Sequence, residues 1–193
     1  MRNLIYLILL LSFQFGFSQD REYHVVELLP NETEAAENVD FYIAEIIDNR
    51  IYKDNIGVSQ KGAFNRKVLT KFSQPFTDEI DAYIKTVFEK DSINKEPIVI
   101  RINRLLISEH TGAFKETGKA LINLDVLQKI DEDYLFMGSY TAMREKNSMD
   151  VTRKHDDRIR AILKDCIMQY VAADKDSLES RPINMDQPME PVI

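Results

Sequence analysis

The stretch ALINLDVL, residues 120–127, decides the fold that the sequence predicts, because apolar and polar side chains alternate along it. Alternation with a period of two is typical of a β-strand with one face against a core and the other toward water. We therefore expect Asn123 and Asp125 to lie on a face that water reaches. The buried face would consist of Ala120, Ile122, Leu124 and Val126.

Two further strands flank this stretch, at residues 98–108 and 134–143. In the first of them, alternating isoleucines give way at residues 105–107 to consecutive apolar residues, and a β-bulge or a twist there would keep both parts buried. Residues 111–112 and 131–133 have turn compositions. Antiparallel hairpins are therefore the simplest connections between the three strands.

Two helices are predicted on either side of these strands in the sequence, at residues 73–90 and 152–173. Each has apolar residues at spacings of three and four, which form one stripe along the helix. The stripe of the second helix includes the only cysteine, Cys166. We expect Cys166 to be a buried structural thiol, since free cysteines are commonly core residues.

Upstream of the helices, residues 23–29 and 39–47 are rich in strand-forming residues, whereas residues 48–71 lack periodicity and predict a long loop. From residue 39 the order is therefore β-α-β-β-β-α. These elements predict an α+β domain at residues 39–173. It would be a two-layer sandwich in which two helices cover one face of a mainly antiparallel sheet of roughly three to five strands.

The chain begins with a predicted secretory signal peptide at residues 1–18. A positive residue, an apolar run and small residues at the end are the three parts of such a signal, and the run is shorter than the about 20 residues of a membrane-spanning helix. Cleavage after Ser18 would leave Gln19 first, where a lipoprotein has its acylated cysteine. We therefore expect release into the periplasm, or into the extracellular space, without a membrane span in the mature chain.

The segments that flank the domain have simpler predictions. Residues 19–38 would contain a short strand followed by an acidic linker. Residues 174–193 contain three prolines and no periodicity, which predicts a disordered acidic tail. One domain with two flanking segments is therefore expected.

The charge balance is acidic, with 25 Lys and Arg against 32 Asp and Glu and a formal net charge of −7. It argues against duplex nucleic acid as a partner, because affinity for the duplex comes from basic residues that neutralise phosphates. No P-loop or G-x-G-x-x-G motif occurs in the sequence. We therefore predict no cofactor.

The three histidines, His24, His110 and His155, are far apart, and none has a metal-binding spacing such as H-E-x-x-H. Acidic residues follow His155 directly, but neighbouring residues in a helix point in different directions and cannot share one ion. A structural role at the start of the helix is the simpler interpretation, and we predict no metal ligand and no catalytic residue. The alternative is a periplasmic hydrolase or metal-dependent enzyme in which His110 or His155 converges with acidic residues in a pocket.

Residues 48–71 are unusually basic for this acidic chain, with six basic residues against two acidic ones. Long loops are disproportionately functional, so an anionic envelope component or the acidic surface of a partner would suit this segment. The alternative is a solvated loop whose Tyr52, Ile56 and Phe64 pack on the sheet. An open sheet edge could also accept a strand of a partner. The predicted binding residues are Arg50, Lys53, Lys61, Arg66 and Lys67.

The sequence FYIAEIIDNR at residues 41–50 is followed by Ile56 and Gly57, a helix, three strands and a closing helix. This arrangement, over residues 39–171, resembles the small envelope domains found as auxiliary lipoproteins of ABC transporters and as the N-terminal domain of the Tol-Pal translocation protein. Members of these families look like accessory or assembly factors, which implies a protein-binding role. The sequence thus predicts an exported envelope accessory protein without catalytic activity that contacts a protein partner or an anionic envelope component.

Overall fold

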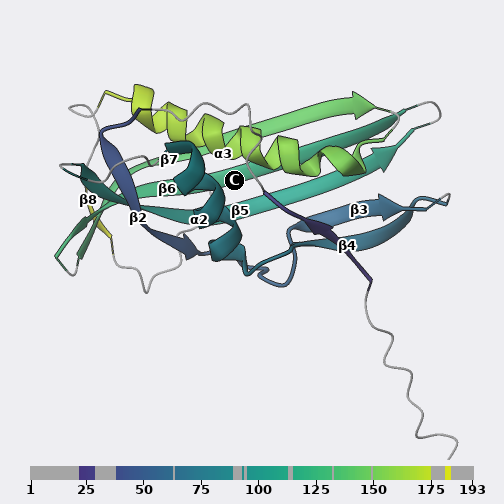
Figure 1. Cartoon of the computed structure of the whole chain (residues 1–193), viewed down its shortest axis with the longest axis horizontal. Coiled ribbons are helices and arrows are strands. Elements are labelled where there is room, and N and C mark those ends of the chain that lie inside the picture. Colours follow the sequence, from purple (N-terminus) through teal and green to yellow (C-terminus); the bar gives the residue numbers. More distant parts are fainter. Residues whose placement is uncertain are drawn as a thin grey trace, which may run out of the picture.

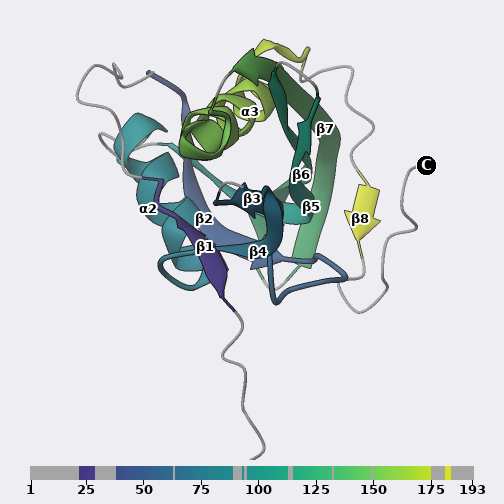
Figure 2. The same ribbon diagram turned by 90° about the vertical axis from the view of Figure 1, so that its right-hand side faces the viewer.

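Among the described residues, eight strands form one strongly curled, mixed sheet, and two α-helices lie against it (Figures 1 and 2). The computed structural model describes residues 22–28, 38–62, 64–88, 93, 95–112, 115–131, 133–148, 150–174 and 181–183. The predicted signal peptide and most of the predicted acidic linker lie outside these residues. Within the predicted tail, residues 181–183 form a strand, and residues 175–180 and 184–193 lie outside the described residues.

The helices are α2 (Phe76–Phe88) and α3 (His155–Ala172), and one turn of 3-10 helix, η1 (Thr152–Lys154), precedes α3. The strands in chain order are β1 (Tyr23–Val26), β2 (Phe41–Asp48), β3 (Gly57–Lys61), β4 (Arg66–Phe72), β5 (Glu96–Thr111), β6 (Glu116–Ile130), β7 (Asp133–Ser148) and β8 (Arg181–Ile183).

The strand order in the sheet is β1-β4-β3-β5-β6-β7-β8, and β2 pairs with the first half of β5. The long strands β5, β6 and β7 are antiparallel neighbours, as the turn sequences predicted. β2 runs parallel to β5, and β1 runs parallel to β4. The sheet is therefore mixed.

The predicted two-layer sandwich with roughly three to five strands is wrong, because the sheet has eight strands and curls into a half-barrel. One reason is that most of the segment predicted as a loop forms the β3–β4 hairpin. Ser59 and Thr70 lie inside this hairpin and share a buried hydrogen bond of 2.7 Å, so polar residues occupy positions where the pattern of a strand requires apolar ones.

The length of the central strands is the second reason for the curl. β5, β6 and β7 have 16, 15 and 16 residues, and the right-handed twist of a sheet accumulates along such strands. β5 contains a bulge, but it falls between Ile102 and Arg104 and not at residues 105–107, where a bulge or a twist was expected. A second bulge follows Phe136 in β7. Bulges bend strands and increase their twist.

The core lies between one face of the sheet and the two helices, as the alternating and helical patterns predicted. Ala120, Ile122, Leu124 and Val126 of β6 are all buried. Cys166 of α3 is fully buried, and desolvation, helped by the nearby Asp165, raises the pKa of its thiol to about 12. The prediction of a buried cysteine is confirmed.

The opposite face of the sheet differs from the prediction at Asp125, which is fully buried rather than wet. Arg101 lies opposite it on β5 and donates two hydrogen bonds to Asp125 Oδ2, from Nε at 3.0 Å and Nη2 at 2.8 Å. Asn103 donates to the same oxygen at 2.8 Å and to Asn123 Oδ1 at 3.1 Å. A buried charge is thus accommodated because the neighbouring strand supplies its partner.

Candidate functional site

The basic segment forms two separate sites, so the five predicted binding residues do not come together. Arg50 and Lys53 lie in the connection between β2 and β3, whereas Lys61, Arg66 and Lys67 lie at the tip of the β3–β4 hairpin. Lys61 is four residues from Gly57, where β3 begins. At about 3.3 Å per residue, the tip is about 13 Å from that point.

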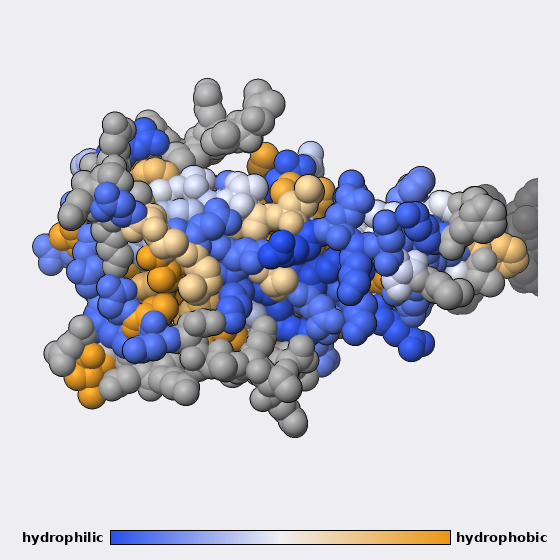
Figure 3. Space-filling view, turned by 90° about the horizontal axis from the view of Figure 1, so that it is seen from above, coloured by the Kyte–Doolittle hydropathy of each residue, from blue (hydrophilic) through white to orange (hydrophobic). Residues whose placement is uncertain are grey.

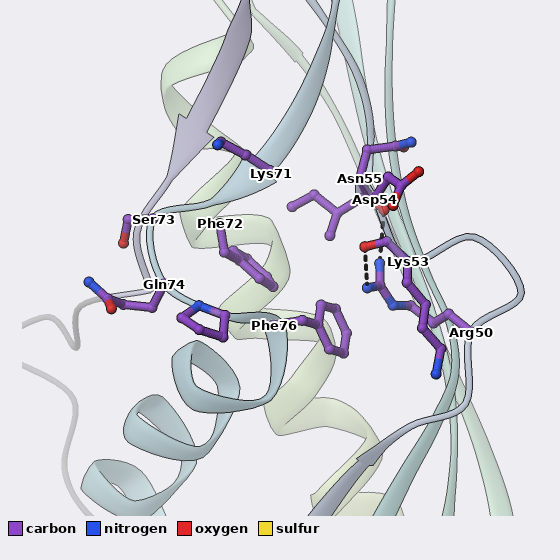
Figure 4. A pocket seen from close by; sticks show the side chains of 11 residues that line it. Arg50, Lys53, Asp54, Asn55, Lys71, Phe72, Ser73, Gln74 and Phe76 are labelled. Atoms are coloured by element: carbon purple, nitrogen blue, oxygen red, sulfur yellow. Dashed lines mark hydrogen bonds between the residues drawn. The ribbon is translucent and has the colours of Figure 1, made fainter.

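The first site is an open cleft of about 330 Å³ between residues 50–56, the end of β4 and the start of α2 (Figure 4). The rings of Phe72 and Phe76 line it, with their centroids 5.6 Å apart. Lys53 and Lys71 are exposed at the cleft, and Lys71 Nζ lies 4.8 Å from the ring centroid of Tyr23. The cleft therefore has an aromatic wall and two exposed basic side chains.

Arg50, one of the predicted binding residues, makes structural contacts in this cleft. Its Nε and Nη2 donate to the two carboxylate oxygens of Asp48 at 2.8 and 2.9 Å, and its Nη1 and Nη2 donate to the carbonyls of Asn55 and Lys53 at 2.8 and 3.2 Å. The guanidinium carbon lies 3.5 Å from the ring centroid of Phe76. With only 5% of its surface exposed, Arg50 holds this connection in place.

The second site, which we call the hairpin tip, comprises Lys61, Phe64, Arg66 and Lys67 and lies at the far right-hand end of the β3–β4 hairpin in Figure 1. A turn joins the two strands, with the Asn65 N–H bonded to the Gly62 carbonyl at 3.0 Å. Phe64 lies in this turn and is 96% exposed, the largest exposed fraction among the large apolar residues described. The interpretation that Phe64 and Tyr52 pack on the sheet is wrong, although Ile56 is buried.

The basic residues of the hairpin tip are partly balanced by one acidic residue. Glu22, directly before β1, forms ion pairs with Lys61 at 2.6 Å and with Arg66. The hydrogen bonds from Lys61 and Arg66 lower the pKa of the Glu22 carboxyl, so it is ionised at neutral pH. Three positive charges and one negative charge leave the hairpin tip positive in an acidic protein.

A third group of polar residues, which sequence patterns did not bring together, is buried between β5 and the start of α3. Glu109 Oε1 lies 2.5 Å from His155 Nε2, and Glu109 Oε2 accepts hydrogen bonds from the Gln60 N–H at 2.6 Å and the Thr152 hydroxyl at 3.0 Å. Arg158 Nη1 lies 2.9 Å from His155 Nδ1. We call Glu109, His155 and Arg158 the buried triad.

The contacts of the buried triad define the tautomer of His155. Arginine only donates hydrogen bonds, so Nδ1 of His155 accepts from Arg158, and Nε2 carries the proton that is donated to Glu109. The side chains of Glu109 and His155 have no exposed surface. His155 therefore fastens the first turn of α3 to β5, which agrees with the structural role predicted for it.

The alternative of an enzyme that uses His110 or His155 gains no support from this geometry. His110 is exposed on β5, whereas His155 is buried, and neither lines the cleft at Arg50 or the groove between β7 and α3. Among the described residues, no group of three or more His, Cys, Asp or Glu side chains is placed to hold a metal ion. No helix in the described ranges is long and apolar enough to cross a bilayer.

Glu109 of the buried triad and the neighbouring His24 predict that the protein loses stability in acid. Burial raises the pKa of Glu109, but hydrogen bonds from His155, the Gln60 N–H and Thr152 outweigh it, and the net pKa lies below the ordinary 4.5. Burial is the main cause that lowers the pKa of His24 below 6.5, and the neighbouring His155 contributes less. Both groups bind protons more weakly in the folded state, so the free energy of unfolding should fall below pH 6.5 and again below pH 4.5.

Urea unfolding at a series of pH values measures this dependence, with Glu109→Gln as the matched control. The glutamine keeps the size of the side chain and cannot titrate, so the step below pH 4.5 should be smaller in this variant. An unchanged acid step in Glu109→Gln would show that other carboxyl groups cause the loss.

No family model and no curated protein matches the sequence. Among solved structures, the fold is similar to a protein from Xanthomonas campestris described as DUF330, with 13% sequence identity and a TM-score of 0.38. The alignment covers 77% of this chain and 89% of that one. The resemblance to transporter-associated lipoproteins and to the Tol-Pal domain stays a prediction.

Proposed function

We propose that the chain is an exported envelope accessory protein without catalytic activity, and that its hairpin tip contacts an anionic lipid surface. The observation that carries the proposal is Phe64, which is 96% exposed on a turn between three basic residues. Apolar side chains that enter the boundary between headgroups and acyl chains, together with cations that face anionic headgroups, are the basis of interfacial binding. Export rests on the predicted signal peptide.

The size of the hairpin tip favours a lipid surface over a protein partner at this site. A stable protein interface buries about 800 Å² on each partner, which is more surface than the hairpin tip can supply. Lipid contact has no such requirement, because one inserted aromatic ring and each basic residue near the surface contribute separately, the latter by about 1 kcal/mol. The expected binding is weak, reversible and sensitive to salt.

Co-sedimentation with lipid vesicles tests the proposal on the full mature chain. We expect binding to vesicles of phosphatidylglycerol and phosphatidylcholine, and much weaker binding to vesicles of phosphatidylcholine alone. Phe64→Ser, and separately the triple variant Lys61→Glu, Arg66→Glu and Lys67→Glu, should each lower the bound fraction at least about fivefold.

A matched control is Ile130→Ser, which removes an exposed apolar residue at the opposite end of the sheet, where β6 ends. This variant should bind vesicles as the parent does. Equal binding to both kinds of vesicle, or binding that Phe64→Ser leaves unchanged, contradicts the proposal. If neither kind of vesicle binds, the lipid surface is wrong, and an acidic protein becomes the candidate partner for the hairpin tip.

A further inference from the structure

The edge of β7 and the neighbouring part of α3 form a surface that is separate from the hairpin tip. β8 pairs with β7 only at residues 134–136, and no strand among the described residues covers β7 from Met143 to Asn147. Beside this open edge lies a groove of about 450 Å³ between β7 and α3. It is lined by Ala142, Met143, Arg144, Asp165, Met168, Gln169 and Ala172.

Figure 3 views the molecule from the side where β7 and α3 lie uppermost in Figure 1. Apolar side chains gather there in a patch between hydrophilic ones. Met143 of β7 is 58% exposed and Val171 of α3 is 37% exposed. Arg144 and Asp165 form an ion pair of 2.6 Å at the groove. The surface thus has an apolar part with charged residues beside it.

The hydrogen bonds show which backbone groups of β7 point away from β6. Gln169 of α3 donates to the Thr141 carbonyl at 3.2 Å, so this carbonyl points out of the sheet edge. Backbone direction alternates along a strand, and the groups of Met143, Glu145 and Asn147 therefore point outward too. Pro182, which has no N–H, lies opposite Leu135 in the β7–β8 pair. The backbone groups of Leu135 therefore point toward β6, and those of Tyr134 and Phe136 point outward to β8. The bulge after Phe136 adds one residue to β7, so beyond it the odd-numbered residues point outward, as Thr141 does.

From this geometry we infer that the open edge of β7 binds an extended segment of a partner protein, which adds a strand to the sheet. The outward N–H and carbonyl groups of Met143, Glu145 and Asn147 would pair with the backbone of the segment. Side chains that project from it on the α3 side would meet the groove lined by Ala142, Met168 and Ala172. The segment therefore has apolar residues at alternate positions, and β8 shows that this edge accepts an antiparallel strand.

The charges on β7 disfavour a second copy of the chain as the occupant in the registers centred on residues 144, 145 and 146. Two β7 edges paired antiparallel about Glu145 would place Glu145 opposite Glu145 and Arg144 opposite Lys146. Pairing about Arg144 or about Lys146 places each of these residues opposite its own copy. Like charges directly opposite each other are destabilising, and charged edges are a known protection against self-pairing.

Selection from a displayed library of random ten-residue peptides tests the inference, followed by hydrogen exchange with the selected peptide. In the free protein, the amides of Met143, Glu145 and Asn147 should exchange quickly and those of Arg144 and Lys146 slowly, because the latter are bonded to β6. The selected peptide should carry apolar residues at alternate positions and should slow the three fast amides.

Two variants separate backbone pairing from side-chain contact. Glu145→Pro removes an outward N–H and leaves the bonds to β6 in place, so peptide affinity should fall about tenfold, whereas Glu145→Ala keeps the N–H and should bind normally. Asn147→Pro, nearer the end of β7, serves if Glu145→Pro does not fold. Ala172→Trp fills the groove and should also weaken binding.

The inference is wrong if selection yields no peptide whose affinity depends on Glu145→Pro or Asn147→Pro, or if peptide binding leaves the three amides unprotected. A dimer in solution that Glu145→Pro dissociates would identify a second copy as the occupant and overturn the inference. Because these readouts use no lipid, they succeed or fail independently of the vesicle experiment on the hairpin tip.

Discussion

Replacing Asp125 with alanine is expected to lower the free energy of unfolding by about 3–5 kcal/mol, among the largest effects of any single substitution in this protein. Arg101 and Asp125 are 1% and 0% exposed, and the variant removes both hydrogen bonds that the guanidinium donates to the carboxylate. It also removes one bond from Asn103. A buried charge that loses its counter-charge is costly because water cannot replace the lost contacts. Urea unfolding measures the change.

The exposed ion pair between Lys119 and Glu145 is the matched control for this prediction. Its side chains are 49% and 42% exposed, and its nitrogen–oxygen distance of 2.7 Å is similar to the 2.8 Å of the buried pair. Glu145→Ala should therefore cost at most about 0.5 kcal/mol. If Asp125→Ala costs no more than Glu145→Ala, burial does not determine the strength of the Arg101–Asp125 pair.

Replacing both members of the buried pair should be far less harmful than removing one. The double variant Arg101→Met and Asp125→Leu leaves apolar residues of similar size at adjacent positions of β5 and β6, so no unpaired charge remains. We expect its stability to lie within about 1 kcal/mol of the parent, and well above that of Asp125→Ala. A double variant as unstable as the single one would assign the cost to packing rather than to charge.

Local periodicity was sufficient to predict the elements that line the core. The alternation of residues 120–127 correctly identified the inner face of β6, and the two apolar stripes located α2 and α3 to within three residues at each end. These predictions succeeded because the residues of a buried face recur at every second position in a strand and at every third or fourth position in a helix. Residues 39–173, predicted as one domain, contain most of the described elements.

The curl of the sheet was not predictable in this way, because it depends on contacts between distant residues. The β3–β4 hairpin buries Ser59 against Thr70, a pair that satisfies its own polar groups and so gives no apolar signal. The link from Glu109 to His155 spans 46 residues and has no sequence pattern. By contrast, Arg101 and Asp125 could have been paired once residues 98–108 and 120–127 were aligned as a hairpin.

The candidate site was predicted in part. The excess of basic residues at 48–71 marked an unusual segment. Net charge does not distinguish Arg50, which contacts Asp48 and Phe76, from the exposed Lys61 and Lys67. The sequence did contain a signal that Arg50 forms an ion pair, because the acidic residue Asp48 is only two residues before it. Phe64 was available as a signal too, because an aromatic residue in a turn between basic residues has no core to enter.

Replacing Gly57 with alanine is the second substitution with a large expected effect, about 3–4 kcal/mol of destabilisation. Gly57 begins β3 with a φ of +128°, and a Cβ atom there would lie 2.0 Å from the carbonyl oxygen of Ile107 on β5. The carbonyl belongs to a central strand, so neither backbone can move without breaking the sheet. The Ile107 N–H is also bonded to the Ile56 carbonyl at 2.8 Å, which fastens the hairpin to β5 at this point.

Gly62→Ala is the control that separates backbone conformation from close contact. Gly62 also has a positive φ, +75°, but a Cβ atom there would have nothing within 4 Å. Its replacement should lower the free energy of unfolding by only about 1–2 kcal/mol, which is the cost of placing alanine in the left-handed conformation. Thermal and urea unfolding of the two variants should therefore differ by about 2 kcal/mol, and equal losses would show that the approach of β3 to β5 is looser than 2.0 Å implies. Because only glycine allows this approach, position 57 determines where the hairpin leaves the sheet, and hence where the hairpin tip with Phe64 is presented.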